Sequence, residues 1–175
     1  MDDTERLFRT YHTPLVRYLT RRLGDRDWAE EVAQETFLRA LRHPGGALTN
    51  ERSWLFAVAT NLVRDDARKD ARRRHHLALL ADEVRDDAAP AADSALERAQ
   101  EQAVARRALD VLDDRDRNAL LMREEGLDYH EIAEALELSV GSVGTTLSRA
   151  RRRLVEAYEA LQQDKRSAGA RDVAG

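Results

Sequence analysis

The residues best suited to recognition chemistry lie in YHEIAEALELSVGSVGTTLSRARRRL, residues 129–154. Apolar residues recur at helical spacing on both sides of a short turn, which predicts a helix-turn-helix. The outward face of its second helix carries hydroxyl and guanidinium groups, which can read base edges and contact phosphates of duplex DNA. A helical hairpin with a solvated basic face is the alternative. The candidate DNA-reading residues are Ser142, Thr145, Thr146, Arg149, Arg152 and Arg153.

A second group of side chains lies in ERSWLFAVATNLVRDDARKDARRR, residues 51–74. On a helix, Trp54, Asn61, Arg64 and Arg68 fall on one stripe, opposite an apolar core face. An aromatic ring, an amide and guanidinium groups suit an unstacked base and its backbone. From the residues alone, a half-buried packing role for Trp54 and a solvated face for the arginines are favoured over this reading.

A third candidate lies in DWAEEVAQETFLRAL, residues 27–41. Leu38 falls outside the predicted buried arc of this helix, beside Glu31, Gln34 and Glu35. An exposed leucine framed by acids and an amide is typical of a protein-docking patch. Single exposed leucines are also common on protein surfaces, so both interpretations stay open at this point.

Catalytic and metal-binding chemistry has no candidate in the sequence. The chain has no cysteine, which excludes disulfides and thiolate metal sites. HEIAE begins like the zinc motif H-E-x-x-H, but Glu134 stands where the second histidine is needed. Without a nucleophile–base pair or a phosphate-binding loop, we expect no enzyme, no cofactor and no metal.

Helices must position these side chains, because Ala, Leu, Arg and Glu dominate the 175 residues. We predict an all-α chain with helices near 4–22, 27–42, 51–74, 95–112, 115–124, 128–136 and 140–161. These form two small helical domains, residues 1–77 and 97–163, joined by an acidic flexible linker at 78–96. Residues 164–175 are predicted to be a disordered tail.

The charge pattern narrows the class of partner. The net charge is −4, yet basic side chains cluster near residues 64–74 and 149–153, which favours local phosphate contacts over general nucleic-acid coating. No apolar run reaches bilayer length and the N-terminal residues are acidic, so we expect a cytoplasmic protein without membrane insertion.

Taken together, the three stretches resemble one family, the bacterial RNA polymerase sigma factors of the extracytoplasmic-function group, which keep only regions 2 and 4. AEEVAQETFLRA resembles the segment that binds core polymerase, and WLFAVATNLVRD resembles the segment that melts and reads the promoter −10 element. The helix-turn-helix resembles the part of region 4 that reads the −35 element. The resemblance covers about 150 residues.

The resemblance implies a role for each candidate residue. Glu31, Gln34, Glu35 and Leu38 would face the clamp helices of the polymerase. Asn61 and the Pro44–Asn50 loop would hold a flipped base of the −10 element, with Trp54 on the same stripe, while Arg64 and Arg68 follow the DNA backbone. The partners implied are core RNA polymerase, promoter DNA and an anti-sigma protein, with a monomer expected for the free chain.

The helix-turn-helix departs from the family where Gly144 and Thr146 stand, because many members have basic residues there. Losing two such contacts would weaken −35 binding by roughly 1–3 kcal/mol each if nothing compensates. Two alternatives therefore stay open besides a promoter-specificity subunit. One is a stand-alone helix-turn-helix regulator, and the other is a sigma-like decoy that binds polymerase without reading DNA.

Overall fold

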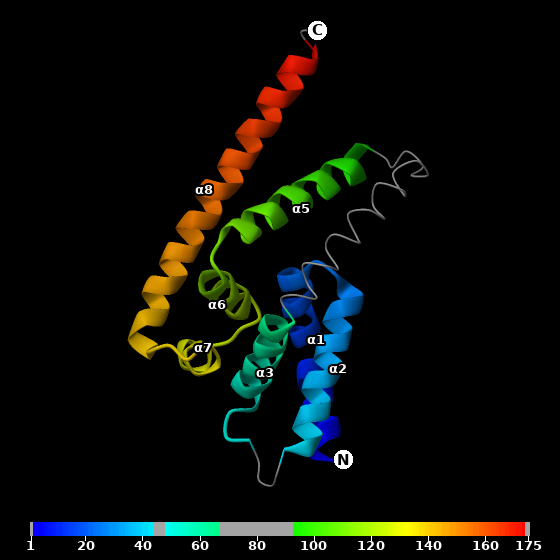
Figure 1. Ribbon diagram of the computed structural model, residues 1–175, viewed down its shortest axis with the longest axis vertical. Coiled ribbons are helices and arrows are strands. Elements are labelled where there is room, and N and C mark those ends of the chain that lie inside the picture. Colours follow the sequence, from blue (N-terminus) through cyan, green and yellow to red (C-terminus); the bar gives the residue numbers. More distant parts are fainter. Residues whose placement is uncertain (1, 44–47, 67–92, 174–175) are drawn as a thin grey trace.

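The computed structural model describes residues 2–43, 48–66 and 93–173, and these are helical with short connections (Figure 1). No strand occurs within these ranges. Most observed helix ends lie within two or three residues of the predicted ones. The helices are α1 (Asp3–Leu23), α2 (Arg26–Arg42), α3 (Glu51–Asp65), α5 (Asp93–Val111), α6 (Asp114–Glu124), α7 (Tyr129–Leu136) and α8 (Val140–Val173).

The N-terminal unit is a bundle of α1, α2 and α3 with a sharp reversal between its first two helices. Gly24 ends α1 in the left-handed conformation, at φ 72°, and its N–H donates to the Thr20 carbonyl. Asp25 then caps α2 by accepting a hydrogen bond from the backbone N–H of Trp28. The Trp28 side chain is buried in the bundle core, so its role is packing.

The helix-turn-helix of the C-terminal unit consists of α7 and the start of α8. A reciprocal capping box between Asp128 and Glu131 starts α7. Glu137 then turns the chain in the left-handed region, at φ 55°. Buried Ala133 and Val143 lie where the two helices pack, as the sequence predicted.

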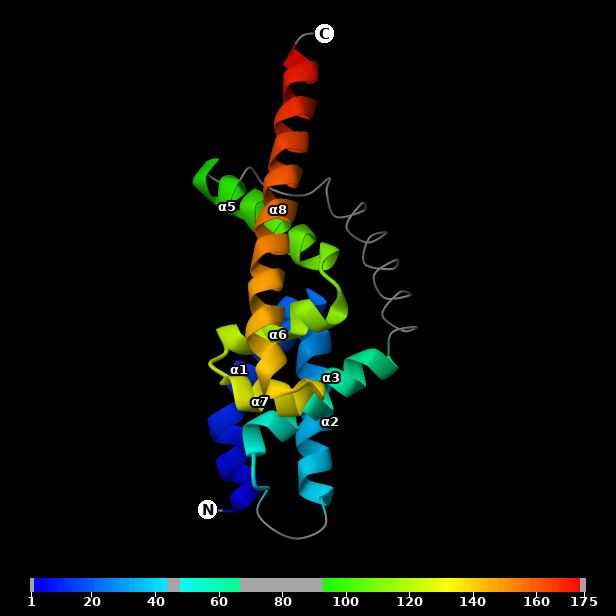
Figure 2. The same ribbon diagram turned by 90° about the vertical axis from the view of Figure 1, so that its left-hand side faces the viewer.

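The two units share one hydrophobic core. Residues of α6 and α7 such as Met122 and Ile132 belong to the same buried cluster as Leu15 and Phe56 of the N-terminal bundle. Helix α6 packs on α1, and α7 packs on α3 (Figures 1 and 2). The sequence left the relative placement of the units open, and the structure places them in direct contact.

Three predicted boundaries need correction. The helix predicted over residues 51–74 ends earlier, because α3 stops at Asp65 with Asp66 as its C-cap. The tail predicted to be disordered from residue 164 is helical, because α8 continues to Val173. This part of α8 contacts α5, because Lys165 donates a 2.9 Å hydrogen bond to Gln100. The predicted linker at 78–96 also ends too late, since α5 begins at Asp93, an acid suited to a helix N-terminus. The rest of that linker lies outside the described residues.

Among the described residues, no helix is both long enough and apolar enough to span a bilayer.

Candidate nucleic-acid and protein interfaces

The exposed front of α8 carries small side chains. Thr145 and Ser148 are exposed, and Ser142 is half-buried. The Ser142 hydroxyl donates to the Ser139 carbonyl at 2.8 Å, which fixes it on the first turn. No atom lies within 4 Å of the position that a Cβ would take at Gly141. The backbone of this turn is therefore open to close approach by a ligand.

Thr146 does not share this surface. Its side chain is 4% exposed, whereas the sequence placed it on a flank of the DNA-reading face. With Val143 and Leu147 buried beside it, Thr146 belongs to the packed side of α8. In this arrangement it is not available for a DNA contact.

Arg149 makes a two-pronged ion pair with a buried carboxylate. Its Nε and Nη2 atoms lie 3.0 and 2.6 Å from the two carboxylate oxygens of Asp116, which is fully buried. This hydrogen-bonded pair raises the pKa of Arg149. Arg153 reaches the same carboxylate at 3.4 Å, while Arg151 and Arg152 are exposed. Arg149 and Arg153 thus tie α8 to α6, whereas Arg151 and Arg152 are exposed to solvent.

Only part of the predicted DNA-contact stripe on α3 is exposed to solvent. Asn61 is exposed one turn before Arg64. Trp54 is half-buried and meets the ring of His43 edge-on, with the ring centroids 5.4 Å apart. Arg68 and residues 44–47 of the Pro44–Asn50 loop lie outside the described residues, so the predicted base pocket is only partly visible.

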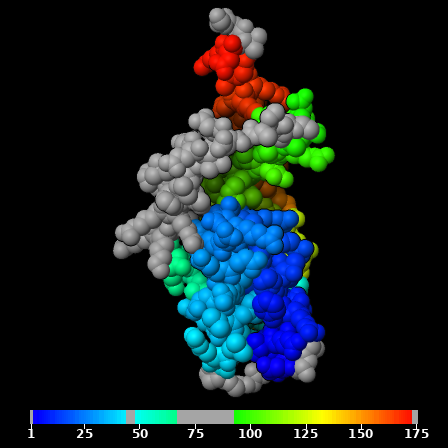
Figure 3. Space-filling view, turned by 90° about the vertical axis from the view of Figure 1, so that its right-hand side faces the viewer, coloured from blue at the N-terminus to red at the C-terminus, as the bar shows by residue number. Residues whose placement is uncertain are grey.

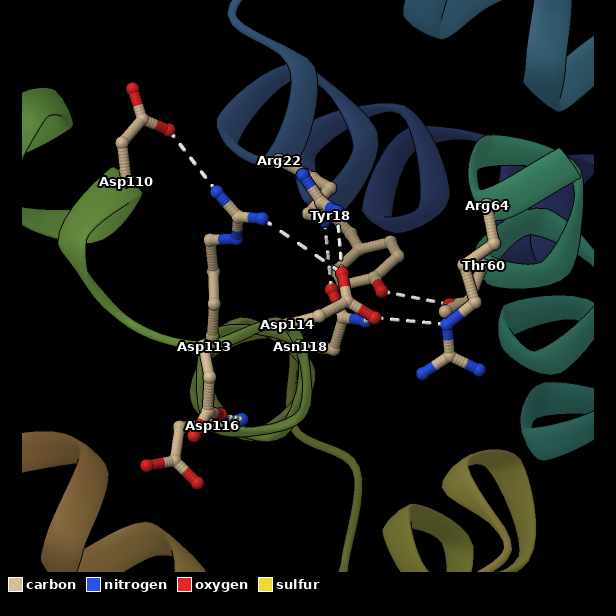
Figure 4. Close-up of polar contacts among 10 residues, drawn as sticks. Tyr18, Arg22, Thr60, Arg64, Asp110, Asp113, Asp114, Asp116 and Asn118 are labelled. Atoms are coloured by element: carbon tan, nitrogen blue, oxygen red, sulfur yellow. Dashed lines mark hydrogen bonds and ion pairs between the residues drawn. The ribbon is translucent and has the colours of Figure 1, made fainter. Parts of the chain in front are cut away.

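Arg64 of this stripe is bound by the C-terminal unit. Its Nε atom lies 2.9 Å from a carboxylate oxygen of Asp114, and Arg22 of α1 contacts the other oxygen at 2.6 Å (Figure 4). Burial opposes ionisation of Asp114, but the hydrogen bonds and charges of Arg64 and Arg22 outweigh it and lower the pKa. Asp114 is therefore an ionised bridge between α1, α3 and α6.

A groove between α1 and α2 carries the third candidate surface. Leu38, Glu31 and Gln34 line it, as the predicted docking patch requires, in a cavity of about 550 Å³. Glu35 does not line it, and instead pairs with Arg39 along α2 at 3.1 Å. Figure 3 shows the face on which α1 and α2, both blue, lie side by side.

The groove includes two exposed side chains that sequence reasoning missed, Phe8 at 46% and Leu41 at 56% exposure. Phe8 stacks on His12, with ring centroids 4.4 Å apart. A phenylalanine five residues after Asp3, where α1 begins, gives no signal of exposure in the sequence, because the packing of α2 decides which arc of α1 is covered. An apolar floor with an acidic rim fits a partner that has apolar side chains and basic flanks.

The described ranges present surfaces that suit binding. Among the described ranges, no group of three side chains could hold a metal ion. What these ranges present instead is a hydroxyl-rich helix front, an amide and guanidinium stripe, and an apolar groove rimmed by acids.

Two protein-family models match the chain in order. The model described as Sigma-70 region 2 matches residues 7–73, and the model described as Sigma-70, region 4 matches residues 102–154. The N-terminal bundle and the C-terminal unit thus match separate regions of the sigma-70 family.

Curated relatives match over most of the chain. The RNA polymerase sigma factor YlaC of Bacillus subtilis is 29% identical over 168 residues, covering 94% of this chain and 97% of the relative. The ferric citrate uptake sigma factor FecI of Escherichia coli is 30% identical over 148 residues, covering 83% and 85%. The ECF RNA polymerase sigma factor SigL of Mycobacterium tuberculosis is 43% identical over 72 residues, which is 39% of this chain and 40% of SigL.

Solved structures show the same fold. The sigma factor RpoE of Bartonella quintana, in complex with the anti-sigma factor NepR, superposes with a TM-score of 0.64 at 22% identity, covering 91% of this chain and 98% of RpoE. CnrH, in complex with the cytosolic domain of CnrY, gives the same TM-score and identity, covering 90% and 88%.

Proposed function

The chain belongs to the sigma-70 family of RNA polymerase sigma factors, with relatives of the extracytoplasmic-function type. From this membership we propose which surface of the chain makes each contact in promoter recognition. The chain is a promoter-specificity subunit of RNA polymerase, a transcription initiation factor. We assign all covalent chemistry to the polymerase and place the protein in the cytoplasm, where bacterial transcription occurs.

The groove between α1 and α2 is the proposed docking site for core polymerase. The observation that carries this assignment is the exposure of Phe8, Leu38 and Leu41 around one groove rimmed by Glu5 and Glu31. An exposed apolar groove of this kind marks a protein–protein contact. Gln34 also lines the groove, whereas Glu35 would act only at its margin.

The α3 stripe is the proposed contact for the −10 element. Asn61 is exposed and can offer its amide to a base edge, while Arg64 can follow the backbone phosphates once Asp114 releases it. Trp54 is half-buried, so it would form the edge of a base platform rather than a free stacking ring.

The front of α8 is the proposed contact for the −35 element. Ser142 and Thr145 would meet base edges, and Arg152 would meet phosphates. Arg149 would act by holding α8 on α6, because its guanidinium is paired with Asp116. The second candidate function is a sigma-like decoy, which binds polymerase without reading DNA. The weakly charged front of α8 favours it, because Gly141 and Gly144 have no side chain that could contact DNA.

An anti-sigma protein is a further proposed partner. RpoE of Bartonella quintana was solved in complex with the anti-sigma factor NepR, and CnrH was solved in complex with the cytosolic domain of CnrY. The shared fold supports the same kind of control here.

Substitutions in the groove test the polymerase contact. Leu38→Asp and Phe8→Asp should each weaken binding to purified core polymerase about tenfold or more, because a charge would enter an apolar contact. Leu96→Asp is the matched control, since Leu96 of α5 is 51% exposed outside the groove. Circular dichroism verifies that all three variants are folded. Equal polymerase affinity of the groove variants and the control would remove the groove from the interface.

A further inference from the structure

A buried carboxylate on α6 holds the helix that presents the proposed −35 surface. Asp116 is fully buried, and its Oδ1 and Oδ2 atoms accept from Nη2 and Nε of Arg149 on α8, at 2.6 and 3.0 Å. Arg153, one turn further along α8, reaches Oδ2 at 3.4 Å. A guanidinium is planar, so a contact through two of its nitrogens fixes its orientation as well as its position. The acid thus holds two successive turns of α8.

The backbone of Asp116 is itself fixed by the N-cap of α6. The Oδ1 atom of Asp113 accepts from the backbone N–H of Asp116 at 3.0 Å, and the two acids lie together at the start of α6 (Figure 4). The Oδ2 atom of Asp113 lies 3.4 Å from Nη1 of Arg153. The cap therefore holds the buried acid in place and contacts α8 directly.

The apolar packing beside this ion pair is small. Ala150 of α8 is buried against Leu112 and Leu120. Apolar contacts have no preferred direction, so a methyl group on this face does little to stop α8 from rotating. A buried ion pair contributes little net stability compared with apolar packing, although removing one partner is costly. The pair between Asp116 and Arg149 therefore matters most for the geometry of α8.

That geometry determines where the front of α8 lies. Ser142 and Thr145 precede Arg149 by seven and four residues, which places all three on one face of the helix. Their hydroxyl groups are short and uncharged, and Gly144 between them adds no side chain. A long basic side chain can adjust to a misplaced helix, whereas a short hydroxyl reaches a base edge only when the helix is placed accurately.

We propose that Asp116 is a positioning residue for −35 recognition. It is buried and does not touch DNA, but through Arg149 and Arg153 it sets the orientation of α8 on which the sequence preference of Ser142 and Thr145 depends. This inference rests on the −35 contact proposed above. It extends that contact to an acid on another helix.

Asp116→Asn tests the proposal in holoenzyme assembled from core polymerase and the full-length chain. The probes are two duplexes with the same −10 sequence. One carries the −35 sequence that wild-type holoenzyme selects from a randomised pool, and the other carries a scrambled −35 sequence. The ratio of the two affinities should fall about tenfold, because two neutral hydrogen bonds to base edges are weakened.

This ratio separates positioning from two other effects of the substitution. Partial unfolding would lower both affinities alike and leave the ratio unchanged. Loss of a negative charge near DNA would raise both affinities, because phosphate repulsion does not depend on sequence. Only a change in how α8 lies on the duplex lowers the affinity for the selected sequence relative to the scrambled one.

Arg149→Lys provides a second variant that keeps the charge of the wild type. A lysine cannot form the two-pronged contact with Asp116, so this variant should lower the ratio as Asp116→Asn does. The double variant should lose no more than either single variant, because both substitutions break one interaction. An arginine that only supplied charge to a phosphate would be replaced by lysine without loss of the ratio.

Two controls match these variants. Asp110→Asn removes the same charge from the same unit, where Asp110 pairs with Arg117 at 3.2 Å, and Arg151→Lys makes the same exchange at an exposed position of α8. Both should keep the wild-type ratio. A wild-type ratio in Asp116→Asn or Arg149→Lys overturns the positioning role. If the wild-type holoenzyme selects no −35 sequence, the −35 contact itself is overturned, and this inference with it.

Discussion

The buried hydroxyl of Tyr18 makes the stability of the N-terminal bundle depend on pH. Its O–H lies 2.8 Å from Thr60, whose own hydroxyl donates to the Phe56 carbonyl, so Tyr18 is the donor to Thr60. Burial is the main reason that the pKa of Tyr18 rises to about 12. An unfolded tyrosine ionises near pH 10, so unfolding releases a proton between pH 10 and 12.

The stability that Tyr18 contributes is therefore complete below about pH 10 and is lost as the pH rises through about 12. Across this window the free energy of unfolding should fall by about 2–3 kcal/mol more in the wild type than in Tyr18→Phe. Urea unfolding at a series of pH values measures this difference. Parallel losses in the two proteins would show that Tyr18 does not titrate in the folded core.

At the residue scale, sequence reasoning located exposed groups better than paired ones. Leu38 and Asn61 are exposed as helical spacing predicted. The pairing of Arg149 with Asp116 was missed, because the partner lies 33 residues away on another helix. Thr146 was placed on a surface but is buried, since a helical projection does not show how far the packed arc extends.

Helix α8 allows a test of the −35 contact at the scale of one element. A Cβ at Gly144 would lie 3.6 Å from the Tyr129 ring, which is ordinary contact, so a side chain fits there. Gly144→Lys should tighten binding to a selected −35 duplex and increase the dependence of log affinity on log salt by about one. Affinity titrations at several salt concentrations measure both effects.

The matched control is Gly169→Lys on the same helix. A Cβ there meets nothing within 4 Å, so this variant gains similar helix propensity, up to about 1 kcal/mol, and the same charge away from the helix front. Weaker DNA binding by Gly144→Lys than by wild type would show that the glycine serves close approach of the backbone instead.

Most elements could be predicted because capping and periodicity are local signals. The capping box at Asp128 and Glu131 and the break after Arg42 are both readable in the sequence. The far end of α8 could not be predicted in this way. Residues 162–173 lack apolar periodicity, and the contact of Lys165 with Gln100 joins two distant parts of the chain.

At the scale of the whole molecule, the placement of the two units was beyond the sequence. It depends on pairs such as Arg22 with Asp114 and Arg52 with Glu131, which are separated by 92 and 79 residues. The distribution of charges along the sequence shows where acidic and basic residues cluster, but it does not show which clusters contact each other in the folded chain.

A reversible cross-link tests whether this placement controls DNA opening. The Asn50 and Glu134 side chains meet at 2.5 Å across the contact, and the cysteine-free chain accepts one cysteine at each position. A short cleavable bismaleimide should then give a protein that binds core polymerase normally but does not open promoter DNA until the linker is cut. The two single-cysteine variants, treated in the same way, are the controls. Normal opening by the linked protein would show that the units need not separate.

The central claim is tested most directly by titrating purified core RNA polymerase with this protein and then mapping single-strand reactivity on randomised promoter fragments. The account predicts stable 1:1 binding, with strand opening confined to fragments that share a −10 sequence. A protein that fails to bind core polymerase, yet protects duplex DNA alone, would contradict it and would identify a stand-alone regulator.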